Sequence, residues 1–233
     1  MTNPEAKKAG LLTRAIGRLR SRRFGYLAKS LVILILAYPY LEVDVPGQLL
    51  LTIITIFVMM SLIVAVSDKK RSIVIALIFA VPWFISLIIN FPVFENSRTV
   101  FIRKEILFAV LLFSYTTFNI FVHLLKSREI TSEILFASVC VYLLIGLTWA
   151  SFYLFIDFLY PNSFVDMTRD TPIDAARILF FSYITLTTVG YGTLTPSSDP
   201  ARSLALLEAI IGQLYLAIMV ARLVGLHISK PRA

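Results

Sequence analysis

The sequence predicts an all-α membrane protein, with six transmembrane helices and a short re-entrant helix between the fifth and the sixth. Hydrophobic residues make up 58% of its 233 residues and charged residues only 15%, which leaves too little polar surface for a soluble domain. A helix needs about 20 residues to cross a hydrocarbon core about 30 Å thick, and six apolar segments reach that length. These segments are 28–43, 49–67, 72–91, 104–125, 133–160 and 203–228.

The part of the chain before these segments, residues 1–27, is basic. Leu12, Ile16 and Leu19 recur at helical spacing, and arginines stand between them. An amphipathic helix on the inner leaflet would give this pattern, and so would a solvated basic tail that only fixes the topology. The next part, 28–132, holds four of the spans and is predicted to form a four-helix membrane domain.

The distribution of Lys and Arg predicts that both termini lie in the cytoplasm. With the N-terminus inside, the inner segments hold 16 of the 22 basic residues and the outer segments hold 6. Basic residues gather on the cytoplasmic side, so we expect a multi-pass protein of the cell membrane in this orientation. A nucleic-acid partner is not expected, because the net charge of +8 falls in short blocks between apolar runs and not on a basic face.

The region between the last two spans, 161–202, is too polar and too rich in Pro and Gly to cross the bilayer. It contains one apolar run, from Ile173 to Thr187. A run of about 15 residues is too short to span and suits a re-entrant helix that is surrounded by protein. In the orientation given above, this segment opens to the outside.

Residues 187–192, which end and follow this run, read Thr-Thr-Val-Gly-Tyr-Gly. A naked ion inside a membrane needs oxygen atoms in place of its water shell, and backbone carbonyls supply them when successive ones point toward one axis. Such a backbone needs positive φ at some residues, which glycine adopts at low cost. Gly190 and Gly192 provide this freedom, and Thr188 adds a hydroxyl at the inner end. One chain carries one such loop, so four chains are needed to surround an axis.

The segment Phe181-Ser-Tyr-Ile-Thr-Leu-Thr-Thr-Val-Gly-Tyr-Gly-Thr193 resembles the pore signature of the potassium channel superfamily. The resemblance covers 133–228 of the predicted pore domain, 133–233, and implies a pore helix at 173–187 followed by a selectivity filter. Thr187 would support this filter. The residues that would bind K⁺ through their carbonyl oxygens are Thr188, Val189, Gly190, Tyr191 and Gly192. K⁺ at these carbonyls is the only metal expected, and no cofactor is expected.

Three features depart from the pattern of the superfamily. Many members have Asp directly after the filter, where this chain has Thr193. Ile184 stands where some bacterial channels place a carboxylate, and Phe180 and Phe181 stand where Trp is common. We therefore expect a thinner hydrogen-bonded cuff around the outer filter, which bears on filter stability more than on potassium selectivity.

The last span carries the other candidate functional residues. Glu208 lies five residues into it, where a carboxylate is costly and usually has a partner. We expect it behind the filter, hydrogen-bonded to the pore helix or loop; the alternative is an interfacial position near the outer surface. Gly212 stands at the hinge position of the superfamily. The residues that follow it at helical spacing either line the cavity and inner gate or pack against other helices: Gln213, Leu216, Val220 and Val224.

The predicted function is passive, potassium-selective conduction through a homotetramer in the lipid bilayer. The fourth span carries no charge from Ile106 to Val122, so steep voltage gating is not expected. The alternatives are a weakly selective cation channel, with a filter loosened at Thr193, a non-conducting accessory subunit, and a secondary transporter or uptake subunit. The last is disfavoured, since the chain has one loop and no second half. No catalytic set of residues points to an enzyme, and control by a separate regulatory subunit stays open.

Overall fold

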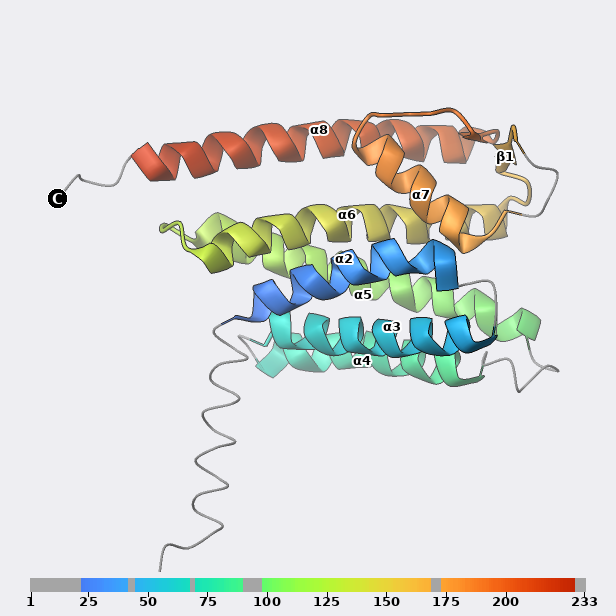
Figure 1. Ribbon diagram of the computed structural model, residues 1–233, viewed down its shortest axis with the longest axis horizontal. Coiled ribbons are helices and arrows are strands. Elements are labelled where there is room, and N and C mark those ends of the chain that lie inside the picture. Colours follow the sequence, from blue (N-terminus) through green and yellow to red (C-terminus); the bar gives the residue numbers. More distant parts are fainter. Residues whose placement is uncertain (1–21, 42–44, 68–69, 90–97, 169–172, 229–233) are drawn as a thin grey trace, which may run out of the picture.

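The computed structural model describes residues 22–41, 45–67, 70–89, 98–168 and 173–228. These ranges contain seven helices and two short strands. In chain order they are α2 (Arg23–Leu41), α3 (Val45–Ala65), α4 (Lys70–Ile89), α5 (Arg98–Lys126), α6 (Ser132–Leu159), β1 (Phe164–Asp166), α7 (Ala175–Leu186), β2 (Leu194–Pro196) and α8 (Asp199–Ile228) (Figure 1). The predicted amphipathic segment around Leu12 lies outside the described residues.

Five of these helices are long and apolar enough to cross a membrane. They are α2, α3, α5, α6 and α8. The protein is therefore all-helical apart from the two strands, and it carries several membrane-capable helices. The helix α4 has 20 residues but is not among the five, so the sixth predicted span stays a prediction. The helix α7 has 12 residues and rises only about 18 Å at 1.5 Å per residue.

The six long helices all begin one to six residues before the predicted spans, whereas α2, α3, α4 and α6 end one or two residues short of them. Polar side chains cap the starts of α6 and α7. The first helix starts at Arg23, inside the segment 1–27 that was expected to precede it. Thr131 precedes α6, and its hydroxyl accepts a hydrogen bond from the Ile134 N–H at 3.3 Å. Asp174 does the same for α7, since its carboxylate accepts from the Arg177 N–H at 2.8 Å. Side-chain oxygens at these positions satisfy N–H groups that have no partner within the helix.

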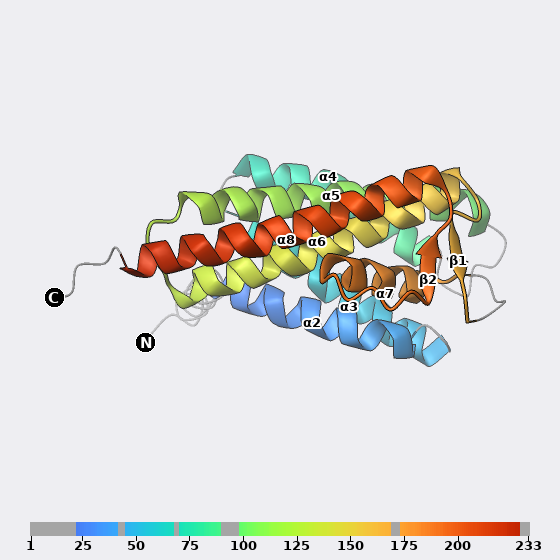
Figure 2. The same cartoon turned by 90° about the horizontal axis from the view of Figure 1, so that it is seen from above.

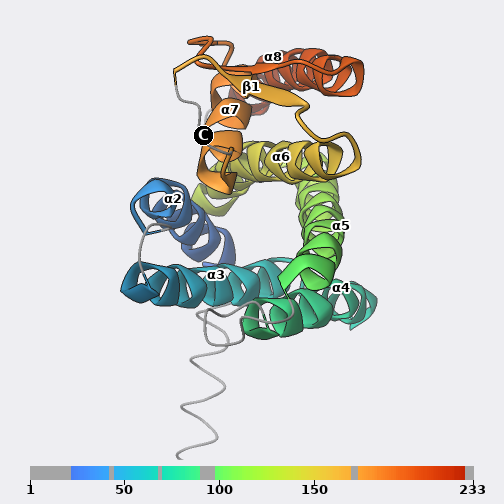
Figure 3. The same cartoon turned by 90° about the vertical axis from the view of Figure 1, so that its right-hand side faces the viewer.

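The long helix α6 lies between two groups of helices. On one side it packs against α7 and α8, and on the other against α5 and α2. The remaining helices, α3 and α4, pack on α2 and α5 and lie farthest from α8 (Figure 1). In the view along the helices, α2 to α6 surround a common centre, with α7 and α8 outside that group (Figure 3). The helix α6 is thus a shared wall between a four-helix part, α2 to α5, and a second part that contains α7 and α8.

The loop between α5 and α6 contains only residues 127–131. So short a connection makes the two helices antiparallel neighbours, and they run side by side over much of their length (Figure 2). The four-helix part therefore packs mainly against α6, through α5 and α2. Buried leucines at this wall, among them Leu112 and Leu144, belong to one continuous core.

Candidate ion-binding loop

The short helix α7 is held close between α6 and α8 by two glycines. A Cβ atom at Gly146 of α6 would lie 2.5 Å from the ring of Tyr183, and one at Gly212 of α8 would lie 2.4 Å from the carbonyl oxygen of Leu186. Neither distance is possible for a real side chain, so only glycine lets α7 approach this closely. The phenol of Tyr183 then donates a hydrogen bond to the Leu143 carbonyl of α6 at 2.7 Å. Gly212, predicted as a hinge, thus lies where the end of α7 meets α8, and α8 continues through it from Asp199 to Ile228.

The loop that follows α7 has positive φ at every second residue. The φ angles are +58° at Thr188, +55° at Gly190 and +78° at Gly192. The two glycines adopt this conformation cheaply, whereas an L-residue pays about 1–2 kcal/mol for it. Thr188 is such a residue, and the sequence did not single it out for this conformation. Its hydroxyl donates to the Thr187 carbonyl at 2.7 Å, a local bond that accompanies the strained backbone.

Backbone hydrogen bonds tie the start of this loop to α7. The Ile184 carbonyl accepts from the N–H groups of Val189 and Gly190, at 2.9 Å and 3.2 Å. The Thr188 N–H donates to the Thr185 carbonyl at 2.9 Å. These bonds turn the chain back on the end of the helix, so the position of α7 determines where the loop begins.

Two side chains of the loop lie on the outside of the protomer. Val189 is 52% exposed and Tyr191 70% exposed. The ring of Tyr191 stacks on Phe180 of α7, with ring centroids 6.2 Å apart and an interplanar angle of 5°. Phe180 stands where Trp is common in the potassium channel superfamily, but it has no indole N–H to donate. Its contact with the loop is therefore apolar.

A pair of strands, which no sequence signal was strong enough to predict, braces the segment after the loop. The strand β1 pairs antiparallel with β2, with Val165 opposite Thr195. The Met167 N–H extends the ladder by donating to the Thr193 carbonyl at 2.8 Å. Thr193, which replaces the usual Asp, is therefore held through its backbone. Each strand has only three residues, too few for an alternating pattern to stand out.

The same brace is attached to α7 by an ion pair and by aromatic packing. The Arg177 guanidinium lies 3.2 Å from the Asp166 carboxylate, and these side chains are 19% and 8% exposed. Phe164 of β1 packs edge-on against Phe181 of α7 at 5.4 Å, and both contact Tyr153 of α6. The strand β1, the short helix α7 and α6 are thus joined in one cluster beside the loop.

Glu208 lies fully buried where α6, α7 and α8 meet. One carboxylate oxygen is 2.6 Å from the Ser182 hydroxyl of α7, and the other contacts the Tyr153 hydroxyl of α6. The structure therefore places Glu208 against the helix that precedes the loop and not at an interface with water. Ser182 and Tyr153 were not singled out in the sequence, because a single Ser or Tyr in an apolar helix carries no distinctive pattern.

Three stripes of residues run along α8 and face different surroundings. Gly212, Tyr215 and Met219 are buried against the rest of the protomer together with Glu208. The predicted cavity residues lie on another stripe, and all are exposed: Gln213, Leu216, Val220 and Val224. The Gln213 amide approaches the Thr188 hydroxyl at 3.4 Å, so the Gln213 end of this stripe lies beside the start of the loop. Packing within the protomer therefore does not explain the stripe.

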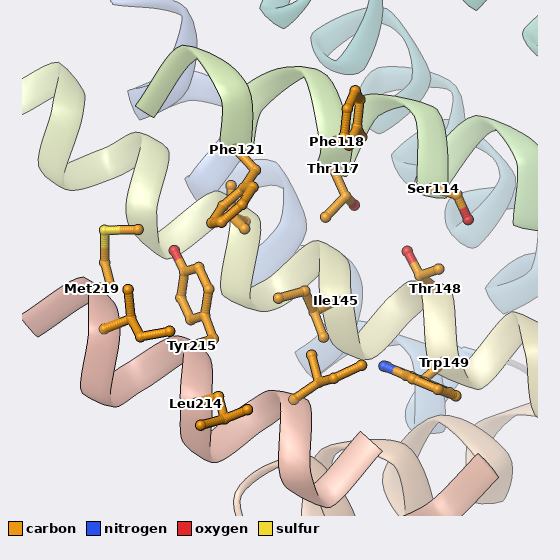
Figure 4. Close-up of a pocket in the computed structure, with 13 residues that line it drawn as sticks. Ser114, Thr117, Phe118, Phe121, Ile145, Thr148, Trp149, Leu214, Tyr215 and Met219 are labelled. Atoms are coloured by element: carbon orange, nitrogen blue, oxygen red, sulfur yellow. The ribbon is translucent and has the colours of Figure 1, made fainter. Parts of the chain in front are cut away.

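The third stripe consists of Ile211, Leu214 and Ile218, and it faces an apolar cavity of about 380 Å³ between α5, α6 and α8 (Figure 4). Its walls include Phe118 of α5, Trp149 of α6 and Leu214 of α8. The hydroxyls of Thr117 and Thr148 line it too, but each donates to a carbonyl of its own helix, at 2.7 Å. The cavity separates α5 from α8 over part of their length.

Nearer the C-terminus of α8, Arg222 links this helix to the C-terminal end of α5 through hydrogen bonds. Its Nη2 atom donates to the carbonyls of Leu125 and Ser127, both at 2.7 Å. The last carbonyls of a helix have no partner within it and carry the negative end of its dipole, so a guanidinium is well suited to them. Phe121 of α5 and Tyr215 of α8 also meet here, with ring centroids 6.4 Å apart.

A short helix, a loop with positive φ at every second residue and a following long helix thus succeed one another in the chain. Residues 130–227 match the sequence model of the family described as "Ion channel". This match supports the ion channel superfamily and is consistent with a potassium channel, and it covers the part of the chain from the start of α6 to the end of α8. None of the curated proteins and none of the solved structures compared with the chain matches it.

Proposed function

We propose that four copies of this chain form a potassium-selective channel in which residues 188–192 are the selectivity filter. The observation that carries the proposal is positive φ at Thr188, Gly190 and Gly192, with ordinary φ between them. Alternation of this kind is what a chain needs if its successive carbonyl oxygens are to line one axis and replace the water shell of an ion.

The membrane arrangement follows from length and charge. We take α2, α3, α4, α5, α6 and α8 as the six spans and α7 as the re-entrant pore helix. The helix α4 is included because its 20 residues reach about 30 Å and its charges, Lys70 and Arg71, lie in the first turn. The excess of basic residues on one side supports an orientation with both termini in the cytoplasm and the loop toward the outside.

The exposed stripe of α8 supports a tetramer. One protomer supplies one loop, and the apolar side chains of Leu216, Val220 and Val224 have no contact within it that buries them. Around a fourfold axis, these stripes would face one another below the loops and form the inner pathway. Gln213 would stand at its upper end, next to Thr188.

Conduction through this pore is not steeply voltage-dependent. Over Ile106–Leu125, the helix α5 has no Lys, Arg, Asp or Glu, whereas a sensing helix needs several charges that cross the field. Each such charge would supply about 2.3 kcal/mol per 100 mV. The stimulus that opens the channel is therefore sought in the pore helices, the lipid or a separate subunit.

Purified protein in liposomes tests the proposal. A potassium gradient should drive flux through the wild-type protein, and the reversal potential in mixed sodium and potassium should follow the potassium gradient. The Gly190→Asp variant should lose this flux while still assembling, because a charged side chain at a residue with φ of +55° disrupts the filter backbone.

The outcomes separate the alternatives. A reversal potential that ignores the potassium gradient would show a weakly selective cation channel. Absence of flux in the assembled wild-type protein would leave a non-conducting accessory subunit. Equal flux in the wild type and the Gly190→Asp variant would refute the filter assignment.

A further inference from the structure

The buried cluster around Glu208 contains three close oxygen–oxygen contacts. The Tyr153 hydroxyl meets one carboxylate oxygen of Glu208, and the Ser182 hydroxyl lies 2.6 Å from the other. Ser182 also lies 2.8 Å from the Gly146 carbonyl oxygen. All three side chains are fully buried, so no bulk water fills a missing partner.

These contacts need three hydrogen atoms, one for each. A tyrosine hydroxyl and a serine hydroxyl supply one each, and a backbone carbonyl supplies none. If Glu208 is ionised, only two hydrogens serve three contacts. Either the Ser182 oxygen then faces the Gly146 carbonyl without a hydrogen, or it faces the carboxylate without one. Two acceptors at such a distance repel each other, and a buried acceptor without a donor is destabilising.

A neutral Glu208 provides the third hydrogen. Its O–H donates to Ser182, Ser182 donates to the Gly146 carbonyl, and Tyr153 donates to the remaining oxygen of Glu208. All four groups then form one chain of hydrogen bonds that runs in a single direction, in which each bond strengthens the next.

The electrical surroundings agree with a neutral acid. Within the described residues, Glu208 forms no ion pair, and its polar contacts are the two hydroxyls. The other titratable side chains near enough to interact with it are phenols, Tyr142 of α6 and Tyr183 of α7. A charged carboxylate in such a place would be costly, because neither a cation nor water compensates it.

The position of Ser182 links this chain of bonds to the filter. Ser182 precedes Ile184 by two residues, and the Ile184 carbonyl holds the Val189 and Gly190 N–H groups. We propose that Glu208 works as a neutral carboxylic acid that donates a hydrogen bond to Ser182. This bond fixes the position of α7 relative to α6 and α8, and with it the position of the filter. Glu208 is then a positioning residue, and its ionisation at high pH breaks the chain. The effect on conduction rests on the proposed channel function, whereas the protonation state does not.

Infrared spectroscopy of the protein in liposomes tests the protonation state without reference to conduction. At neutral pH the wild type should show the carbonyl stretching band of a buried protonated carboxylic acid, shifted in heavy water and absent from Glu208→Gln. Glu133→Gln is the matched control, because Glu133 on α6 accepts from the Phe24 N–H at 3.1 Å but lacks the two-hydroxyl setting; it should leave the band in place. Absence of a band that Glu208→Gln removes would overturn the proposal, whether or not the protein conducts.

Potassium flux as a function of pH tests the positioning role. A Gln amide donates to Ser182 and accepts from Tyr153 as the neutral acid does, so Glu208→Gln should conduct at neutral pH. Glu208→Leu removes both bonds and should reduce flux at least about tenfold. Wild-type flux should fall as the pH is raised and Glu208 ionises, while the flux of Glu208→Gln stays level. Parallel pH profiles for the two proteins, or full flux in Glu208→Leu, would overturn the role of Glu208 in positioning the filter.

Discussion

At the scale of single residues, the loop combines free and strained backbone. Gly190 and Gly192 adopt positive φ at little cost, but Thr188 adopts it with a β-branched side chain. Strain of this kind persists only where the surroundings determine the conformation. The bonds from Thr188 to Thr185 and Thr187, and the approach of Gln213, are the contacts that do so here. The hydroxyl expected at the inner end of the filter therefore comes with a backbone that α7 and α8 hold in place.

Gly212 permits a close approach of α8 to the end of α7, and its replacement tests that function against a hinge. In Gly212→Ala the new Cβ would lie 2.4 Å from the Leu186 carbonyl oxygen, a backbone atom that cannot turn aside. We expect a loss of about 1–3 kcal/mol in the free energy of unfolding, measured by thermal unfolding in detergent, together with reduced potassium flux.

Gly225→Ala is the matched control on the same helix. No atom outside the local helix lies within 4 Å of a Cβ at Gly225, so the change should be neutral or stabilise α8 by up to about 1 kcal/mol. If Gly212→Ala alters gating but unfolds like the wild type, Gly212 is a hinge and the close approach to Leu186 is of no consequence.

At the scale of elements, the brace of β1 and β2 holds the segment that follows the proposed filter, since the Met167 N–H donates to the Thr193 carbonyl at 2.8 Å. The Asp166–Arg177 pair connects β1 to α7, and Arg177 also lies 3.6 Å from Asp174, the residue that caps α7. Part of Arg177 is exposed, so solvent weakens the pair. Its free-energy contribution is therefore expected to be small but its position significant, since it joins α7, which precedes the proposed filter, to β1, which pairs with β2 after the filter.

Asp166→Asn should loosen this brace. The substitution keeps the shape of the side chain and removes its charge, and we expect a loss of about 0.5–1 kcal/mol in stability. Because β2 follows the filter directly, the variant should also lose conduction faster during sustained flux than the wild type. A double-mutant cycle with Arg177→Gln measures the coupling, and a second cycle, Asp199→Asn with Arg202→Gln, serves as control, since these two side chains are 95% and 62% exposed. A coupling energy no larger than that of the control would show that the pair does not brace the outer segment.

The elements that the sequence predicted are those with a strong repeating signal. Apolar runs of spanning length marked the helices, and the structure moves their ends by a few residues, because a helix such as α6 begins at its capping residue, Thr131, and not where the apolar run begins. The brace and the Glu208 cluster depend on contacts between residues far apart in the chain. Tyr153 and Glu208 are 55 positions apart, and nothing in either helix alone indicates that they meet. The sequence thus placed Glu208 near α7 but gave neither of its partners.

At the scale of the whole molecule, the four-helix part, α2 to α5, contacts the proposed pore helices in two places. One is the broad contact of α5 and α2 with α6, which is a fixed wall of buried side chains. The other runs directly from α5 to α8, the helix whose exposed stripe we assign to the ion pathway. The apolar cavity separates α5 from α8 near Phe118 (Figure 4). The contacts between these two helices therefore lie mainly around Phe121 and Arg222. Movement of the four-helix part would therefore reach the inner end of α8 before its outer end.

Removal of the Arg222 contacts should free the inner end of α8 and leave the filter in place. Arg222→Met keeps the length of the side chain but leaves the carbonyls of Leu125 and Ser127 without their donor. We expect a loss of about 1–2 kcal/mol in stability and faster hydrogen exchange in the last turns of α8, with exchange in α7 unchanged. Arg202→Met, at the outer end of the same helix, is the control, because Arg202 is largely exposed and its bond to the Pro196 carbonyl is long, at 3.3 Å. Equal exchange at residues 216–228 in both variants would contradict a coupling through Arg222. Faster exchange in α7 as well would mean that Arg222 stabilises the fold as a whole and does not specifically join the four-helix part to the inner end of the pathway.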